Sequence, residues 1–176
     1  MVMESIIDSD IESFHFSNGF ISEHLFGFRP GHSSLDMLLL ISQQWIEVLN
    51  AKHEIRAISL DILRAFYTVW HPALQTKLSS CGIQGNLHSW LADFLSCGSQ
   101  RVDLNGILSS PLPVQAGVPQ GSVLGPVLFL VFFNNLSDSL ENPLSLFADD
   151  SALCHTIFHP TDWQAAASPL SADQDK

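Results

Sequence analysis

The sequence predicts one mixed α+β domain of helices and short, mainly antiparallel strands. Three observations support this prediction. Apolar residues recur at helical spacing over residues 33–50 and 87–98, an Asn-Gly pair separates two apolar runs at 105–106, and two strand-like runs flank adjacent acids within residues 144–157. With 176 residues, 46% of them hydrophobic, the chain is long enough to bury a sizeable core.

The two acids in the stretch LSLFADDSALCHTI, residues 144–157, are the first candidate site. Apolar residues alternate on both sides of Asp149 and Asp150, which predicts a hairpin with one buried face and the acids at its turn. Asp is a common turn former, so a solvated turn and a metal site are both open readings of these residues alone.

A third acid ends a short apolar run at residues 55–61, IRAISLD. We expect a largely buried strand here, with Asp61 at its C-terminal end. Carboxylates at strand ends are well placed to bind ligands, whereas an Asp that caps the following turn is the alternative.

A turn over residues 25–34 precedes the first strongly amphipathic helix, and Gly27, Pro30 and Gly31 mark that turn. Ser33 or Ser34 should cap the helix, which should run to about Asn50. Its expected core face consists of Leu35, Leu38, Leu39, Trp45, Ile46 and Leu49. Arg29 in the turn either contacts an anionic ligand or is solvated.

Two more helices and a second hairpin are expected in the middle of the chain. His71-Pro72 opens a helix that Gly82 ends, and the next helix, with Trp90 and Phe94 on its apolar face, ends at Gly98. Asn105-Gly106 predicts a β-hairpin with a type I′ turn, because both residues tolerate positive φ.

A Gly- and Pro-rich loop, QAGVPQGSVLGP at residues 115–126, leads into an apolar helix. Glycines before a helix let a ligand approach the backbone, and the helix N-terminus favours anions. The loop lacks the Lys and the spacing of a P-loop, so it is a weak phosphate-binding signal on its own.

The charge argues against a free-standing nucleic-acid binder. The net charge is −11 with seven Lys and Arg residues, whereas nucleic-acid binders use many cations to neutralise phosphates. The chain therefore either does not hold nucleic acid, or relies on basic surfaces elsewhere, or has lost them.

Cysteines and hydropathy set the expected compartment. Cys81, Cys97 and Cys154 are odd in number and lack metal-ligand spacing, so we expect buried thiols, no disulfide partner and a reducing intracellular compartment, nuclear or cytoplasmic. The longest apolar run is far shorter than the roughly 20 residues of a membrane span, and the acidic N-terminus does not resemble a secretory signal. We expect neither membrane insertion nor secretion.

From about Ile21 onward, the chain resembles the reverse transcriptase domain of non-LTR (LINE-like) retrotransposons. SLDILRAFYTVWH, residues 59–71, resembles the first catalytic motif, in which an aromatic follows a strand-end Asp. AGVPQGSVLGPVLF, residues 116–129, resembles the loop and helix that hold nucleotide and template, and FADD, residues 147–150, resembles the aromatic-x-Asp-Asp box. Three motifs in family order make the resemblance specific.

The resemblance implies a right-hand polymerase palm with part of the fingers, in which a small antiparallel sheet packs on helices and the thumb is missing. It divides the chain into an irregular lead-in over residues 1–20, a partial reverse transcriptase domain over 21–158, and a polar tail over 159–176 with a truncated palm helix interrupted by Pro169. It also accounts for the charge, because the family's phosphate-binding cations lie largely in regions that this sequence lacks.

The implied activity is that of an RNA-directed DNA polymerase. Two Mg²⁺ or Mn²⁺ ions would be held by Asp61 and Asp149 with help from Asp150, and the partners would be an RNA template, a DNA primer and dNTPs. Crowded carboxylates raise one another's pKa unless a cation is present.

The resemblance also implies the nucleotide-binding residues. Phe66 matches the aromatic that lies under the sugar and excludes a 2′-hydroxyl, while Gln120 and Gly121 match the element that lines the nucleotide pocket. The remaining candidates are Phe147 and Ala148 near the primer end, and Arg29 as a nucleotide or template contact.

Departures from the family pattern, Pro169 among them, leave a second hypothesis open. Tyr67 and Asn135 stand where the family commonly has Asp, so the chain could be a catalytically inactive retroelement remnant that acts at most as an interaction module. We expect weak metal binding, and slow or absent polymerisation, from the isolated chain. A metal-dependent phosphatase or nuclease is disfavoured, because no His or Lys pattern offers a general base or a leaving-group acid.

Overall fold

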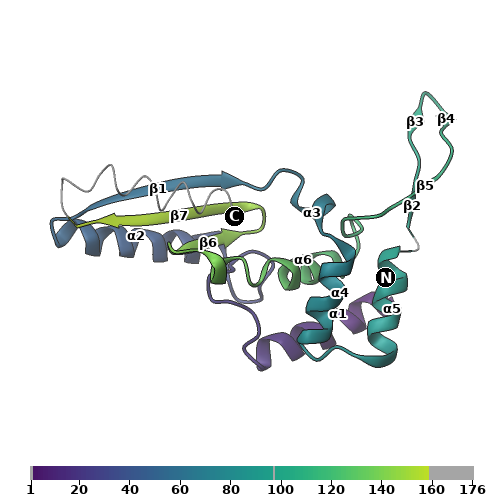
Figure 1. The fold of residues 1–176 in the computed structure, drawn as a ribbon, viewed down its shortest axis with the longest axis horizontal. Helices are drawn as coiled ribbons and strands as arrows, with labels where there is room; N and C mark the ends of the chain where they lie inside the picture. The colour runs from purple at the N-terminus through teal and green to yellow at the C-terminus, as the bar shows by residue number, and fades with distance from the viewer. Residues whose placement is uncertain (1, 97, 159–176) are drawn as a thin grey trace. The chain divides into compact units, whose positions relative to one another are not determined.

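A computed structural model describes residues 2–96 and 98–158 of the chain, which form two compact units (Figure 1). The first unit contains residues up to Ile21 and residues Arg64–Phe133, and the second contains Ser22–Leu63 and the residues from Asn134 onward. Together they contain the helices and the small antiparallel sheet that the sequence predicts. The expected polar tail and its helix near Pro169 lie outside the described residues.

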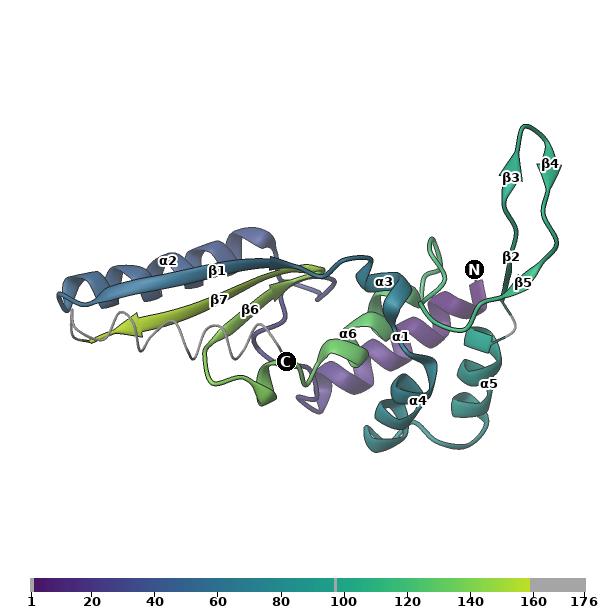
Figure 2. The ribbon, with the colours of Figure 1, turned by 45° about the horizontal axis from the view of Figure 1, so that its top comes forward.

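The second unit is built on a three-stranded antiparallel sheet. Its strand order is β1 (Glu54–Asp61), β7 (Asp150–Ile157) and β6 (Leu144–Phe147). Helix α2 (Ser34–Asn50) packs against β1 and β6 and lies along one face of the sheet (Figure 2), and a 3-10 helix, η1 (Ser137–Ser139), precedes β6. The buried core of this unit contains Leu25, Phe26, Ile41, Leu144, Leu146, Leu153 and Ile157.

Helix α2 begins where the sequence predicts. The Ser33 hydroxyl accepts a hydrogen bond from the Asp36 amide at 3.3 Å, and the Asp36 carboxylate accepts one from the Ser33 amide at 2.7 Å. This reciprocal capping box satisfies two amides that the helix cannot pair. Hydrogen bonds from Ser33 lower the pKa of the Asp36 carboxyl.

The predicted burial of this region was wrong in two places. The face expected to be the core side of α2 is exposed, with Leu35, Leu39 and Ile46 at 62%, 59% and 58%, and Ile41 is the buried position instead. Strand β1, expected to be largely buried, is an edge strand in which Ile55, Ile58 and Leu60 are half-buried and the other five residues are exposed. Periodicity identifies an apolar face, but burial depends on what packs against that face.

The first unit is mainly helical. It contains α1 (Val2–Ser17), α3 (Ala65–Thr68), α4 (His71–Ser80), α5 (Gly85–Ser96) and α6 (Gly125–Phe133). The most buried helix is α6, which contacts α1 and α4, while α4 also contacts α5. This confirms the predicted helices after His71-Pro72, before Gly98 and after the Gly-rich loop. Among the described residues, no helix is long and apolar enough to cross a membrane.

The expected irregular structure over residues 1–20 was wrong, because α1 occupies most of this segment. Ile7, Ile11 and His15 recur every four residues and form the buried stripe of α1. The stripe was overlooked because its third member is a polar residue. His15 is only 1% exposed, its Nδ1 lies 2.9 Å from the carbonyl oxygen of Ile11, and burial lowers its pKa.

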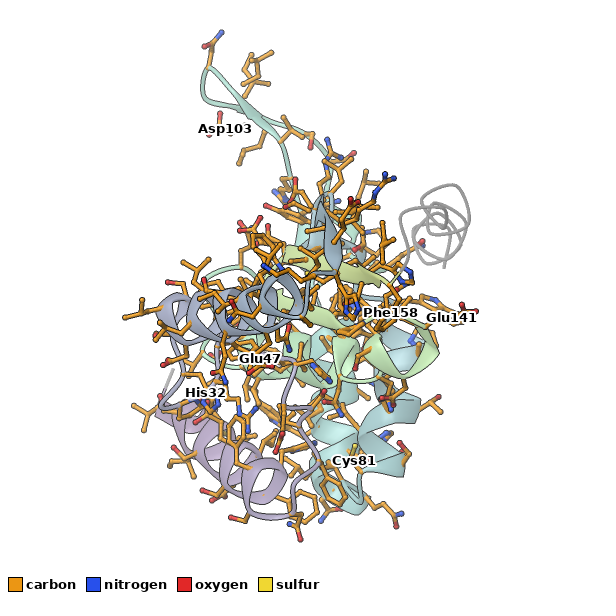
Figure 3. All side chains as sticks on the ribbon, turned by 90° about the vertical axis from the view of Figure 1, so that its left-hand side faces the viewer. His32, Glu47, Cys81, Asp103, Glu141 and Phe158 are labelled. Atoms are coloured by element: carbon orange, nitrogen blue, oxygen red, sulfur yellow. The ribbon has the colours of Figure 1, made fainter. Side chains whose placement is uncertain are left out.

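The predicted hairpin at Asn105-Gly106 is confirmed. Strands β3 (Asp103–Leu104) and β4 (Ile107–Leu108) pair across these two residues, whose φ angles of 53° and 83° are both positive. Strands β2 (Ser99–Gln100) and β5 (Leu112–Pro113) pair on the side away from the turn and, with β3 and β4, form a long two-stranded ribbon. Figure 3 shows Asp103 near the tip of the ribbon, away from the helices of the same unit.

The Gly-rich loop is attached to the segment around α3. The amides of Gly117 and Val118 donate hydrogen bonds to the carbonyl oxygens of Val69 and Phe66, both at 2.8 Å. His71 Nε2 lies 2.7 Å from the Gly117 carbonyl oxygen. Gly117 has a φ of 91°, and a Cβ there would lie 2.9 Å from the Cα of Tyr67, so this position requires glycine for two reasons.

Acidification should destabilise the protein through His15. Since its pKa is lowered in the folded state, the unfolded chain takes up the proton first as the pH falls through the ordinary value of 6.5, and the free energy of unfolding decreases. Urea denaturation at pH about 7.5 and about 5 should show a smaller decrease for His15→Leu than for the wild-type chain. Equal decreases in the two proteins would contradict this role of His15.

Replacing Gly117 with Ala should cost more stability than the same change at Gly121. Both glycines have positive φ, 91° and 78°, but a Cβ at Gly121 meets no atom within 4 Å. We expect Gly121→Ala to lower the free energy of unfolding by about 1–2 kcal/mol and Gly117→Ala by at least about 1 kcal/mol more. Denaturant titrations of the two variants measure this difference, and equal losses would mean that the backbone contact with Tyr67 carries no energy.

Candidate functional site

Asp149 and Asp150 lie at the tip of the β6–β7 hairpin, as predicted. Ala148 and Asp149 form its two-residue turn, and Asp150 begins β7 and pairs with Phe147, the last residue of β6. Ala148 has a φ of 57°, a conformation that is uncommon for residues other than glycine.

The register of the sheet brings Asp61 directly opposite Asp150. These residues end one strand and begin its neighbour in the antiparallel β1–β7 pair. The next residue, Ile62, donates its amide hydrogen to the Asp149 carbonyl oxygen at 3.1 Å. Asp61 and Asp150 therefore form a non-hydrogen-bonded pair, in which the Cα atoms are about 4.5 Å apart and the side chains leave the same face.

The three carboxylates are accessible, and those of Asp61 and Asp150 are like charges on directly opposite residues of the sheet. Asp61 and Asp150 are exposed, and Asp149 is half-buried. Like charges directly opposite each other on neighbouring strands destabilise a sheet, and a cation between them removes the repulsion. Among the described residues, no three acidic, His or Cys side chains converge closely enough to form a ready metal cage. The backbone brings the acids together while their side chains remain unassembled.

Arg29 lies in the same unit as the acids. Its side chain is half-buried, and its Nη1 donates a hydrogen bond to the Ser22 carbonyl oxygen at 3.2 Å. The segment that carries Arg29 continues from residues 24–26, which pair with Leu146 of β6. Phe147, at the end of the same strand, is half-buried.

Three of the predicted nucleotide-binding residues meet at one cavity of the first unit. Phe66, Gln120 and Gly121 line a space of about 330 Å³ at the start of α6. The Phe66 ring is stacked on Phe129 of α6, with 4.4 Å between ring centroids and 15° between planes. The ring orientation is thus fixed by the core, and Gly121 leaves its backbone open because no Cβ covers it.

A larger cavity of the same unit, about 570 Å³, has a mixed lining. Leu95, Val114 and Val118 are among its apolar residues, and its polar residues include Tyr67, Gln100, Gln115 and Gln120. Tyr67 is 55% exposed. Gln120 lines both cavities. Neutral hydrogen-bonding side chains of this kind can contact bases or sugars without attracting phosphate.

Two long-range contacts near the candidate site residues were not predicted from the sequence. Gly27 was interpreted as a turn marker, but it is buried and its φ is not in the left-handed region; what it provides is close contact with the Ala148 backbone. His71 was interpreted as a helix start, yet it also holds the Gly117 carbonyl. Neither feature has a local sequence signal, because each depends on a contact with a distant segment.

A family model described as reverse transcriptase (RNA-dependent DNA polymerase) matches residues 2–165. The chain is 34% identical over 154 residues to a probable RNA-directed DNA polymerase from transposon X-element of Drosophila melanogaster, which covers 85% of this chain and 17% of that protein. It is 33% identical over 141 residues to the RNA-directed DNA polymerase from mobile element jockey of the same species, covering 76% of this chain and 15% of that protein.

The fold has a counterpart among solved structures. The structure of apo telomerase from Candida tropicalis, truncated from the C-terminal domain, matches with a TM-score of 0.66 at 9% identity and covers 99% of this chain and 36% of that one. This likeness concerns the fold alone. Because the family model spans nearly the whole chain and the transposon polymerases are identical at about a third of the aligned positions, the chain belongs to the reverse transcriptase family and represents part of a non-LTR reverse transcriptase domain.

Proposed function

We propose that this chain supplies the metal-binding and nucleotide-binding residues of an RNA-directed DNA polymerase, which joins a dNTP to the 3′-hydroxyl of a DNA primer on an RNA template. Residues 21–158 are then the palm with part of the fingers. The observation that best supports the proposal is the register of β1 and β7, which sets Asp61 opposite Asp150 and beside Asp149.

The donor set suits Mg²⁺ or Mn²⁺. Carboxylate oxygens are the ligands that these hard cations prefer. A bound cation would also relieve the repulsion between Asp61 and Asp150, which favours binding. In the proposed site Asp61 and Asp149 hold the ions, and Asp150 assists them. When bound, the ions would lower the pKa of the primer hydroxyl and stabilise the charge of the leaving pyrophosphate.

The side chains around the smaller cavity give the nucleotide site its selectivity in this proposal. The Phe66 ring is stacked on Phe129, which fixes its orientation. In this proposal the ring lies under the sugar and excludes a 2′-hydroxyl. The Gln120 amide donates and accepts hydrogen bonds, and Gly121 exposes its backbone to the substrate. Phe147 and Ala148 lie near the primer end, and Arg29 contacts a phosphate of the nucleotide or the template.

The charge of the chain limits its affinity for the template and primer. With a net charge of −11, the chain as a whole is electrostatically repelled by nucleic acid, so in this proposal binding depends on divalent cations and on local contacts. We therefore propose weak template binding and slow DNA synthesis by this chain alone.

Metal binding should appear as a gain in stability that depends on the acids. At a metal concentration about ten times the dissociation constant, Mg²⁺ or Mn²⁺ should raise the free energy of unfolding by about 1.4 kcal/mol. Asp61→Asn should abolish this gain, and it should slightly stabilise the metal-free chain by removing the repulsion from Asp150. Denaturation with and without metal measures both effects. Asp93→Asn, an exposed acid in α5, is the matched control and should respond to metal as the wild type does.

Primer extension on a poly(A) template tests the polymerase activity itself. We expect slow incorporation of dTTP that falls at least about 100-fold in Asp149→Ala, because the loss of a metal ligand removes several kcal/mol of charge stabilisation. Asp93→Ala should retain the wild-type rate. Extension that persists in Asp149→Ala would refute the role of the acids, whereas no extension together with no metal response would identify an inactive remnant.

A further inference from the structure

A short segment before α2 extends the sheet of the second unit. The Phe26 amide donates to the Leu146 carbonyl oxygen, and the Leu146 amide donates to the His24 carbonyl oxygen, both at 2.8 Å. Leu25 and Leu146 thus form a parallel bridge on the edge of β6 that β7 does not occupy. Leu25 and Phe26 are 3% and 6% exposed, so this edge contact is part of the core.

The segment ends at Gly27, which lies directly against the acidic turn. A Cβ on Gly27 would overlap the Ala148 amide nitrogen and would lie 3.1 Å from both the Ala148 Cα and the Phe147 carbonyl carbon. These neighbours are backbone atoms, so no change of rotamer can make room for a methyl group. Any side chain at Gly27 must move the turn or the segment.

The need for glycine here comes from the contact and not from the backbone conformation. Gly27 does not have a φ in the left-handed region, so alanine could adopt its backbone angles. Among the glycines of the described chain, a Cβ would come closer to other atoms at Gly27 than at any other. At Gly31, four residues later, a Cβ would meet nothing within 4 Å.

The position of the turn affects the acids on both strands. Ala148 has a φ of 57°, which its surroundings must maintain, and Asp149 accepts the hydrogen bond from the Ile62 amide next to Asp61. A displaced turn would therefore shift Asp149 and loosen the end of β1.

We propose that Gly27 is a positioning residue for the acidic turn. Its missing side chain lets residues 24–27 fit against the Ala148 backbone, which fixes Asp149 beside Asp61 and Asp150. The functional part of this inference rests on the proposed metal role of these acids. The geometric part, that Gly27 sets the position of the turn, stands independently of it.

Hydrogen exchange and metal binding of Gly27→Ala test the two parts together. Amide exchange measured by NMR should become at least about tenfold faster at Phe26 and Ile62, which border the turn, and remain unchanged at Ile58 in the middle of the β1–β7 ladder. A Mn²⁺ titration should show an affinity at least about tenfold lower than that of the wild type.

Gly98→Ala is the matched control, because Gly98 also lacks a left-handed φ and a Cβ there would make ordinary contact with Val114 at 3.5 Å. It should leave the exchange at Ile62 and the Mn²⁺ affinity unchanged. Unchanged exchange at Phe26 and Ile62 in Gly27→Ala would overturn the proposal, and so would equal acceleration at Ile58, because Gly27 would then support the whole sheet. If the wild-type chain binds no Mn²⁺, the proposed metal site fails, while the exchange data still decide the position of the turn.

Discussion

The pairing of β1 with β7 is the constraint on which the acidic site depends. It joins two segments that are far apart in the sequence, and its register alone decides that Asp61 lies opposite Asp150. The pairing also carries an unfavourable interaction, because it places two negative charges opposite each other on one face of the sheet. The proposed binding of a divalent cation would offset this repulsion, because carboxylate oxygens are the ligands that such cations prefer.

Both units use a glycine where a loop meets the backbone of a motif. In the second unit Gly27 lies against Ala148, and in the first Gly117 lies against Tyr67 and is held by His71. Neither glycine has a side chain that could bind a ligand, and each brings its loop into close contact with the backbone of a candidate site segment. These contacts explain how short, irregular segments can be placed accurately on a small scaffold, since backbone contacts leave less freedom than contacts between flexible side chains.

Local signals in the sequence predicted local structure well. The Ser33 cap, the Asn105-Gly106 turn and the hairpin around Asp149 follow from residues within a few positions of one another. Burial and long-range contacts could not be predicted in this way. The apolar face of α2 was identified but not its exposure, and α1 was missed because its buried stripe has only two apolar members and ends in the polar His15. The family resemblance identified the candidate site residues, but no pattern near Gly27 indicates its contact with the turn.

The two-residue turn at Ala148 and Asp149 has a consequence for how this segment can change during evolution. Side chains along a strand alternate between faces, so an insertion or deletion that shifted the pairing register of β7 by one residue would move every side chain of β7 to the opposite face. Leu153 and Ile157 would leave the core, and a different residue would face Asp61. Any change in the length of this turn must therefore preserve the register of β7, which is a stricter requirement than substitution of its exposed residues has to meet.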